Sequence, residues 1–186
     1  MKSSRPPSTL NLNIGSRDMS TDAEPTQHGV IKAIYVARAH NYFGHHGETP
    51  SQHPMIAVNT AECLAGKGLM GDRFFDFKAN YKGQLTFFAT EVFERLRKEI
   101  PSKTAEPWVF RRNILTMGMD LNRLIGKRFR LQGILMQGTE ECRPCYWMNQ
   151  AWGPGAEKAL QGHGGLRVKV LEDGVLSVGQ AKLSLE

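Results

Sequence analysis

Short apolar runs, rich in β-branched residues and separated by glycines, recur along the chain. The run at residues 30–37 has the composition of a central strand. Similar runs predict further strands at residues 55–58, 84–88, 113–116, 128–131 and 134–137. Towards the C-terminus, residues 166–171, 175–178 and 181–185 predict a β-meander, with Asp173 and Gly174 in a hairpin turn. The pattern therefore favours β structure.

Residues 90–100 carry the clearest helical pattern, with apolar side chains on one face. Thr90 is predicted to cap the N-terminus of this helix, and Pro101 ends it. A shorter helix is predicted at residues 155–160. Because closing a sheet removes the exposed edges of many short strands, the predicted fold class is mainly β. We expect a β-barrel of mostly antiparallel strands with one or two packed helices.

The 186 residues suffice for one domain with a hydrophobic core. The first part of the chain is polar and rich in proline, serine and threonine, so it has little apolar surface to bury. Residues 1–29 are therefore predicted to form a flexible N-terminal tail, and residues 30–186 to form the single domain.

The net charge of +6 predicts an affinity for anions. The basic residues are scattered, and aromatic residues are not interleaved with them, so no nucleic-acid partner is expected. No apolar run approaches the length of a membrane span, and the first residues lack the apolar core of a secretory signal. The three cysteines are too few for a disulfide framework. These features predict a cytoplasmic protein without a membrane partner.

The strongest candidate for chemistry is the pair Cys142 and Cys145, separated by Arg143 and Pro144. Four interpretations are open. The first is a thiol–disulfide pair, although the motif lies late in a strand-rich region and not at the front of a βαβ unit. The second is a zinc site, which needs two more ligands, such as Cys63 and His163.

The third interpretation is that both cysteines are buried apolar fillers, for which Arg143 and Pro144 are poor neighbours. The fourth is a single reactive thiolate that binds a soft metal or carries sulfur. Thiolate sulfur suits both kinds of chemistry, and the positive charge of Arg143 favours the thiolate over the thiol.

Several sequence stretches, taken in order, resemble those of MOSC domains, which are named for the C-terminal domain of molybdenum cofactor sulfurases. The resemblance spans nearly all of residues 30–186 and rests on residues 68–73, 83–86, 110–115, 124–126, 142–145 and 170–179. Two positions depart from the family pattern. Gln180 stands where the family usually has Asp, and Phe74 stands where many members have His.

This resemblance implies a MOSC-type β-barrel in which Cys145 is the metal or sulfur ligand and the catalytic residue. It implies a molybdenum cofactor (molybdopterin), with Arg111 and Asn113 beside it. The cofactor ends in a phosphate, and guanidinium groups bind phosphate bidentately. Arg73, Arg111 and Arg143 are therefore predicted cofactor-binding residues, and Thr90 is added because a helix N-terminus attracts anions.

Three functions follow from this sequence analysis. The first is a molybdenum-dependent oxidoreductase that reduces N-hydroxylated compounds. The second is a non-enzymatic carrier of sulfur or of the cofactor, with a persulfide on Cys145. The third is a thiol–disulfide protein. The expected partners are a small-molecule cofactor and substrate and a redox or sulfur-donor protein. The pyridoxal phosphate domain of full-length sulfurases belongs to the family context only.

His45 and His46 are adjacent in a predicted loop. Neighbouring residues of a strand point to opposite faces, so both imidazoles would reach one metal ion only from a loop. Most loop histidines are solvated, and the role of this pair stays open.

Overall fold

The computed structural model describes residues 26–42, 47–102, 104 and 106–186. Most of the predicted tail, and the pair His45 and His46, lie outside the described residues. The first strand, β1 (Gln27–Val36), includes three residues that the sequence analysis assigned to the tail. Gln27 is paired with Leu183 of the last strand, so the folded part of the chain includes this position.

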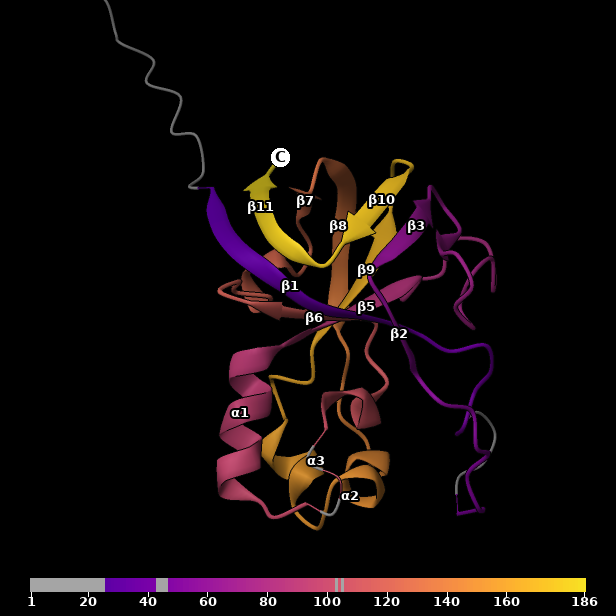
Figure 1. Ribbon diagram of the computed structural model, residues 1–186, viewed down its shortest axis with the longest axis vertical. Coiled ribbons are helices and arrows are strands. Elements are labelled where there is room, and N and C mark those ends of the chain that lie inside the picture. Colours follow the sequence, from indigo (N-terminus) through magenta and orange to yellow (C-terminus); the bar gives the residue numbers. More distant parts are fainter. Residues whose placement is uncertain (1–25, 43–46, 103, 105) are drawn as a thin grey trace, which may run out of the picture.

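Seven strands form a closed barrel, which confirms the predicted fold class (Figure 1). The order around the barrel is β11-β7-β8-β9-β5-β6-β1, and β1 pairs with β11 to close it. Only the β5–β6 pairing is parallel. The strands after β1 are β5 (Leu85–Ala89), β6 (Ile114–Met117), β7 (Arg128–Leu131), β8 (Ile134–Glu141), β9 (Leu166–Val170) and β11 (Gly179–Leu185), and β2 (Ile56–Val58) extends the sheet from β1.

A small second sheet has the order β10-β3-β4, with β3 (Thr60–Leu64), β4 (Gly68–Leu69) and β10 (Gly174–Ser177). The predicted C-terminal meander is therefore wrong, because β9 pairs with β5 and β8 while β10 pairs with β3. The side chain of Asp173 explains the difference. Its Oδ1 accepts a hydrogen bond from the backbone N–H of Ala65 at 2.7 Å, which directs the chain towards the second sheet.

The barrel wall separates two hydrophobic cores. Phe87 on β5 points into the barrel interior, whereas its neighbour Phe88 packs against the helices outside. Neighbouring residues of a strand point to opposite faces, so β5 is buried on both sides. Burial on both sides is why this segment reads as a continuous apolar run and not as an alternating one.

Three α-helices lie within the described residues: α1 (Thr90–Glu99), α2 (Trp147–Ala151) and α3 (Ala156–Ala159). They gather at one end of the barrel (Figure 1), together with a 3-10 turn at Pro107–Phe110. The predicted helices correspond to α1 and α3, whereas α2 was not predicted. No helix in the described part of the chain is long and apolar enough to span a bilayer.

The predicted capping role of Thr90 is wrong. The N-cap residue of α1 is Ala89, and no side chain caps the helix. The Thr90 Oγ1 atom is buried and has no hydrogen-bond partner among the described residues. Instead, Glu91 Oε1 accepts a hydrogen bond from the backbone N–H of Gly118 at 2.6 Å, which ties the first turn of α1 to the loop after β6.

Candidate functional site

A cavity of about 350 Å³ opens where the barrel meets the helices. Its walls come from the loops that follow β1, β4 and β8, from the segment between the 3-10 turn at Pro107–Phe110 and β6, from β5 and β9, and from the start of α2. Four arginines line it, and the described lining residues include no carboxylate: the arginines are Arg73, Arg111, Arg112 and Arg167. The cavity is therefore suited to an anionic ligand.

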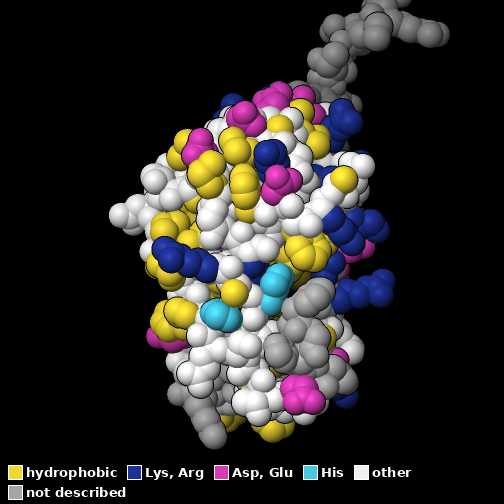
Figure 2. All heavy atoms as spheres, turned by 90° about the vertical axis from the view of Figure 1, so that its right-hand side faces the viewer, with side chains coloured by type: hydrophobic (Ala, Val, Ile, Leu, Met, Phe, Trp, Pro, Cys, Tyr) yellow, Lys and Arg dark blue, Asp and Glu magenta, His cyan; other side chains and the backbone are white. Residues whose placement is uncertain are grey.

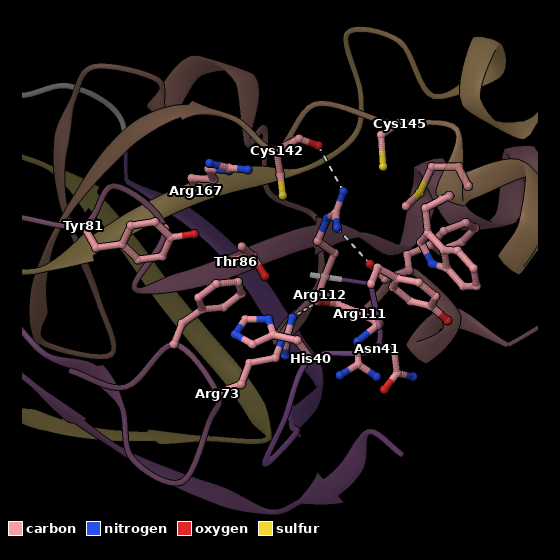
Figure 3. Close-up of a pocket in the computed structure, with 16 residues that line it drawn as sticks. His40, Asn41, Arg73, Tyr81, Thr86, Arg111, Arg112, Cys142, Cys145 and Arg167 are labelled. Carbon is pink, nitrogen blue, oxygen red and sulfur yellow. Dashed lines mark hydrogen bonds between the residues drawn. The ribbon is translucent and has the colours of Figure 1, made fainter. Parts of the chain in front are cut away.

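Both cysteines of the Cys142-x-x-Cys145 motif line this cavity. Figure 3 shows the two sulfur atoms pointing into it from the loop after β8. The Cys145 side chain is exposed, whereas Cys142 is buried, and neither forms a disulfide. Only Cys145 was expected to be a ligand, so the presence of Cys142 in the cavity lining is a new finding.

Arg73 lies in the turn after β4 and forms a buried ion pair with its neighbour. Its Nη1 lies 3.1 Å from Asp72 Oδ2, and both side chains are at most 7% exposed. Its Nη2 donates to the backbone oxygen of Arg111 at 3.0 Å. Burial lowers the pKa of Arg73, and the charge of Asp72 opposes that change. Arg73 is therefore held rigidly at the cavity wall.

Arg111 also lines the cavity, but its guanidinium holds the loop after β1. Nη1 donates to the backbone oxygen of His53 at 2.7 Å, and Nη2 donates to that of Ala39 at 2.8 Å. The residue adopts the left-handed conformation, with φ of 56°, where the 3-10 turn ends. Burial, with the nearby positive charge of Arg73, lowers the pKa of Arg111 to about 10. Its main role in the structure is to position this loop.

Asn113 does not line the cavity, and its side chain is fully buried. Its Oδ1 accepts hydrogen bonds from the backbone and hydroxyl of Thr86, both at 3.0 Å. Its Nδ2 donates to the backbone oxygen of Tyr35 and to Asp72 Oδ2. An amide has two N–H donors, and both are used here. Asn113 is thus a structural link between β1, β5, β6 and the turn that carries Arg73.

Arg112 and Arg167 were not predicted as site residues. Arg112 is fixed by three backbone oxygens, those of Gly164, Phe110 and Cys142, at 2.8–3.0 Å. Three bonds leave two of its five N–H groups for a ligand. Arg167 projects from β9, and its Nη1 lies 3.3 Å from Glu140 Oε1.

Arg167 also lies beside Cys142 in the cavity lining (Figure 3), and the two side chains interact electrostatically. Burial lowers the pKa of Arg167, but its interactions with Cys142, Tyr81 and Glu140 raise it by more, so the net change is upward. The only sequence signal for Arg167 is its alternation with the apolar residues of its strand, which places it on the face opposite the barrel core.

Two predicted cofactor-binding residues do not line the cavity. Arg143 is exposed on the loop after β8, and Thr90 lies at the start of α1. The four ligands of the zinc interpretation are not brought together either. Cys63 is buried in the barrel core, and His163 lines a different cavity, beside α1. Among the described residues, no group of three His, Cys, Asp or Glu side chains is arranged to hold a metal ion.

Part of the cavity wall is aromatic. His40, Phe74 and Tyr81 line it, and the His40 and Phe74 rings are in edge-to-face contact, with centroids 4.8 Å apart. Burial and the charge of Arg73 lower the pKa of His40, so its imidazole is neutral at pH 7. Figure 2 shows histidine side chains close to apolar side chains on the face that it turns to the viewer. A planar ligand therefore meets stacking surfaces beside the arginines, since Arg73 lies over the Phe74 ring with its Cζ 4.8 Å from the ring centroid.

A profile of the MOSC domain family matches residues 65–181. This chain belongs to the MOSC domain family. The match covers the turn with Arg73, both cavity cysteines and Arg167, so it includes most of the site. No curated protein sequence matches the chain.

Solved structures of bacterial proteins share the fold. YuaD from Bacillus subtilis is 15% identical, with 87% of this chain and 98% of that chain covered and a TM-score of 0.66. YiiM from Geobacillus stearothermophilus is 20% identical, with coverage of 87% and 75% and a TM-score of 0.57. YiiM from Escherichia coli is 23% identical, with coverage of 82% and 69% and a TM-score of 0.54. At these identities the likeness concerns the fold.

Proposed function

We propose that this MOSC protein binds the molybdenum cofactor in the arginine-lined cavity, with Cys145 as the metal ligand. The observation that carries the proposal is the exposed Cys145 thiol opening onto a cavity with four arginines and, among its described lining residues, no carboxylate. Sulfur is a soft ligand that suits molybdenum. Guanidinium groups suit the phosphate of the pterin. The donor set therefore fits the cofactor with which the family is associated.

In this proposal each cavity residue has a defined task. Cys145 holds the metal, and Arg112, fixed by three carbonyls, presents its remaining N–H groups to the phosphate. Arg73 and Arg111 keep the walls in place through Asp72 and the loop after β1. When bound, the cofactor supplies two-electron reduction of an N-hydroxylated compound. The neutral imidazole of His40 accepts a hydrogen bond from, or donates one to, such a substrate.

A second candidate function is a carrier of sulfur, with Cys145 as a persulfide. The observation that favours it is the second thiol, Cys142, in the same cavity. In this function no substrate is reduced, and a sulfur-donor protein is the partner.

The experiment uses protein purified from a host that makes the molybdenum cofactor. We expect reduction of an aromatic amidoxime by a chemical electron donor, and its loss in Cys145→Ser. Protein from the same host that leaves the amidoxime unchanged, but gains one sulfur mass on Cys145, supports the carrier function in place of the reductase.

A further inference from the structure

Cys142 is positioned as a second functional thiol, although it is only 5% exposed. Its backbone N–H donates to Gly165 at 2.7 Å, and its carbonyl accepts from Arg112 Nη2 at 3.0 Å. A side chain at Gly164 would overlap the Cys142 carbonyl oxygen, so this glycine permits the close approach. The Cys142 backbone is thus fixed on both sides, and its sulfur points into the cavity (Figure 3).

The surroundings of the two thiols differ. Cys145 is exposed at the start of α2, where its carbonyl accepts from the N–H of Met148 at 2.8 Å. The Cys142 side chain lies beside the guanidinium of Arg167 (Figure 3), which forms an ion pair with Glu140. Cys145 is therefore the thiol that a reagent from solution meets first, and Cys142 is the one beside a fixed positive charge.

We propose that Cys142 accepts a sulfane sulfur atom from a persulfide on Cys145 and holds it beside Arg167. This inference rests on the proposed function of Cys145 as the reactive thiol of the cavity. The occupant of the buried position is a single sulfur atom, supplied by a polysulfide or by the persulfide of a sulfur-donor protein. Cys145 is then restored as a thiolate and is again available as a ligand.

The transfer is balanced without an external oxidant or reductant. The Cys145 thiolate attacks the terminal sulfur of a hydrogen polysulfide, forming Cys145–S–SH, and the electron pair of the broken S–S bond leaves with the shortened polysulfide. The Cys142 thiolate then attacks the outer sulfur of Cys145–S–SH. A new S–S bond forms on Cys142, the old one breaks, and its electron pair returns to Cys145.

Two features favour this direction of transfer. The persulfide extends the reach of Cys145 by about 2 Å within the cavity that Cys142 also lines. The Arg167 guanidinium stabilises the negative charge on Cys142 during attack and on the product persulfide. Burial of Cys142 also limits access of other reagents to the transferred sulfur.

The test exposes the full chain to sodium tetrasulfide, traps persulfides with iodoacetamide after increasing times, and localises the added sulfur by tandem mass spectrometry. In the unaltered protein we expect the sulfur first on Cys145 and then on Cys142. In Cys145→Ser, loading of Cys142 should be slower by about tenfold or more, because the exposed thiol is gone. In Cys142→Ser, the sulfur should stay on Cys145.

Arg167→Gln should leave the sulfur on Cys145, and Arg167→Lys should restore transfer in part, because it keeps the charge. Exposed Arg95→Gln on α1 is the matched control and should behave as the unaltered protein. The order in which the two cysteines are loaded is measured on the unaltered chain, so this result does not depend on whether a variant folds. Three results would overturn the proposal. In the unaltered chain these are sulfur that remains on Cys145 and sulfur that is found on neither cysteine. The third is loading of Cys142 in Cys145→Ser as fast as in the unaltered chain. The cofactor proposal is judged separately, by molybdenum content.

Discussion

The Asn113 amide nitrogen donates a hydrogen bond to the buried carboxylate of Asp72 across a distance of 3.0 Å. The same carboxylate accepts from Arg73 and from the backbone N–H groups of Ala37 and Phe74, each at 3.1 Å. This relationship joins β6 to the turn after β4 and thereby fixes one wall of the cavity. Asp72 is the centre of the network, because its one carboxylate accepts hydrogen bonds from four residues of this wall.

Replacing Asp72 with Asn is expected to destabilise the protein by about 3–5 kcal/mol, because Arg73 is left buried without its counter-charge. Chemical denaturation measures the free energy of unfolding. Asp76→Asn is the matched control, since Asp76 forms an exposed ion pair with Lys67 and has a φ of 52° that Asn tolerates. Its cost should stay below about 1 kcal/mol. Equal costs for the two variants would contradict the role assigned to Asp72.

Arg111→Ala is expected to loosen the loop after β1 while leaving the barrel folded, because Arg111 binds the carbonyls of Ala39 and His53. The amides of Ser51 and His53, which are bonded to Asn41, should exchange with solvent faster. Hydrogen exchange followed by NMR or mass spectrometry measures this. Amides of β9 should keep their protection, and Arg95→Ala should change neither region. Unaltered exchange at Ser51 and His53 would show that Arg111 does not hold the loop.

Cys63 predicts a pH dependence of stability. Burial raises the pKa of its thiol from an ordinary value of 9.0 to about 12. Above pH 9 the unfolded chain loses this proton while the folded protein keeps it, so stability falls as pH rises, by at most about 1.4 kcal/mol per pH unit. The loss ends near pH 12. Denaturation of the unaltered protein and of Cys63→Ala between pH 8 and 11 should give curves that converge, and parallel curves would contradict this.

The cavity is predicted to bind phosphate groups without any metal. Inorganic pyrophosphate, titrated calorimetrically, is the probe. Arg112→Gln should weaken its binding by about ten- to hundredfold, because charge-assisted hydrogen bonds are lost. Arg143→Gln is the control, since Arg143 is exposed and does not line the cavity. Thermal melting of both variants checks that they fold. Similar losses in the two variants would indicate general charge attraction and not a built site.

The sequence predicted the positions of β5 and β9 well. Residues 84–88 and 166–171 lie within one residue of β5, which is buried on both faces, and of β9, whose buried residues alternate with Arg167 and Lys169. In both strands the apolar composition reflects burial that does not depend on the pairing partner. The pairing itself was not predictable for β10. The turn at Asp173 and Gly174 has a hairpin sequence, but the hydrogen bond from Ala65, more than a hundred positions earlier, overrides this local preference.

The site was predictable only in part. The cysteine motif and Arg73 were found because they form local patterns in the sequence. Arg112 and Arg167 were missed, and Arg143 was chosen in their place. Which arginine faces the cavity depends on contacts between distant segments, such as those of Arg112 with the carbonyls of Gly164 and Cys142. The local sequence does not reveal such contacts. The same applies to Asn113. Its motif indicated a functional residue, but its amide is fully used by the backbone of β1, by β5 and by Asp72.

The most direct test of the account is the molybdenum content of protein purified from a cofactor-competent host, measured by mass spectrometry of the metal. We expect the unaltered protein to retain molybdenum, Cys145→Ser to lose it, and Cys142→Ser to keep most of it, since a hydroxyl is a poor soft-metal ligand. Cys63→Ala is the control, because Cys63 lies in the barrel core. Two results would contradict the assignment of Cys145 as the ligand. One is a molybdenum content in Cys145→Ser equal to that of the unaltered protein. The other is an equal loss of molybdenum in Cys142→Ser and Cys145→Ser.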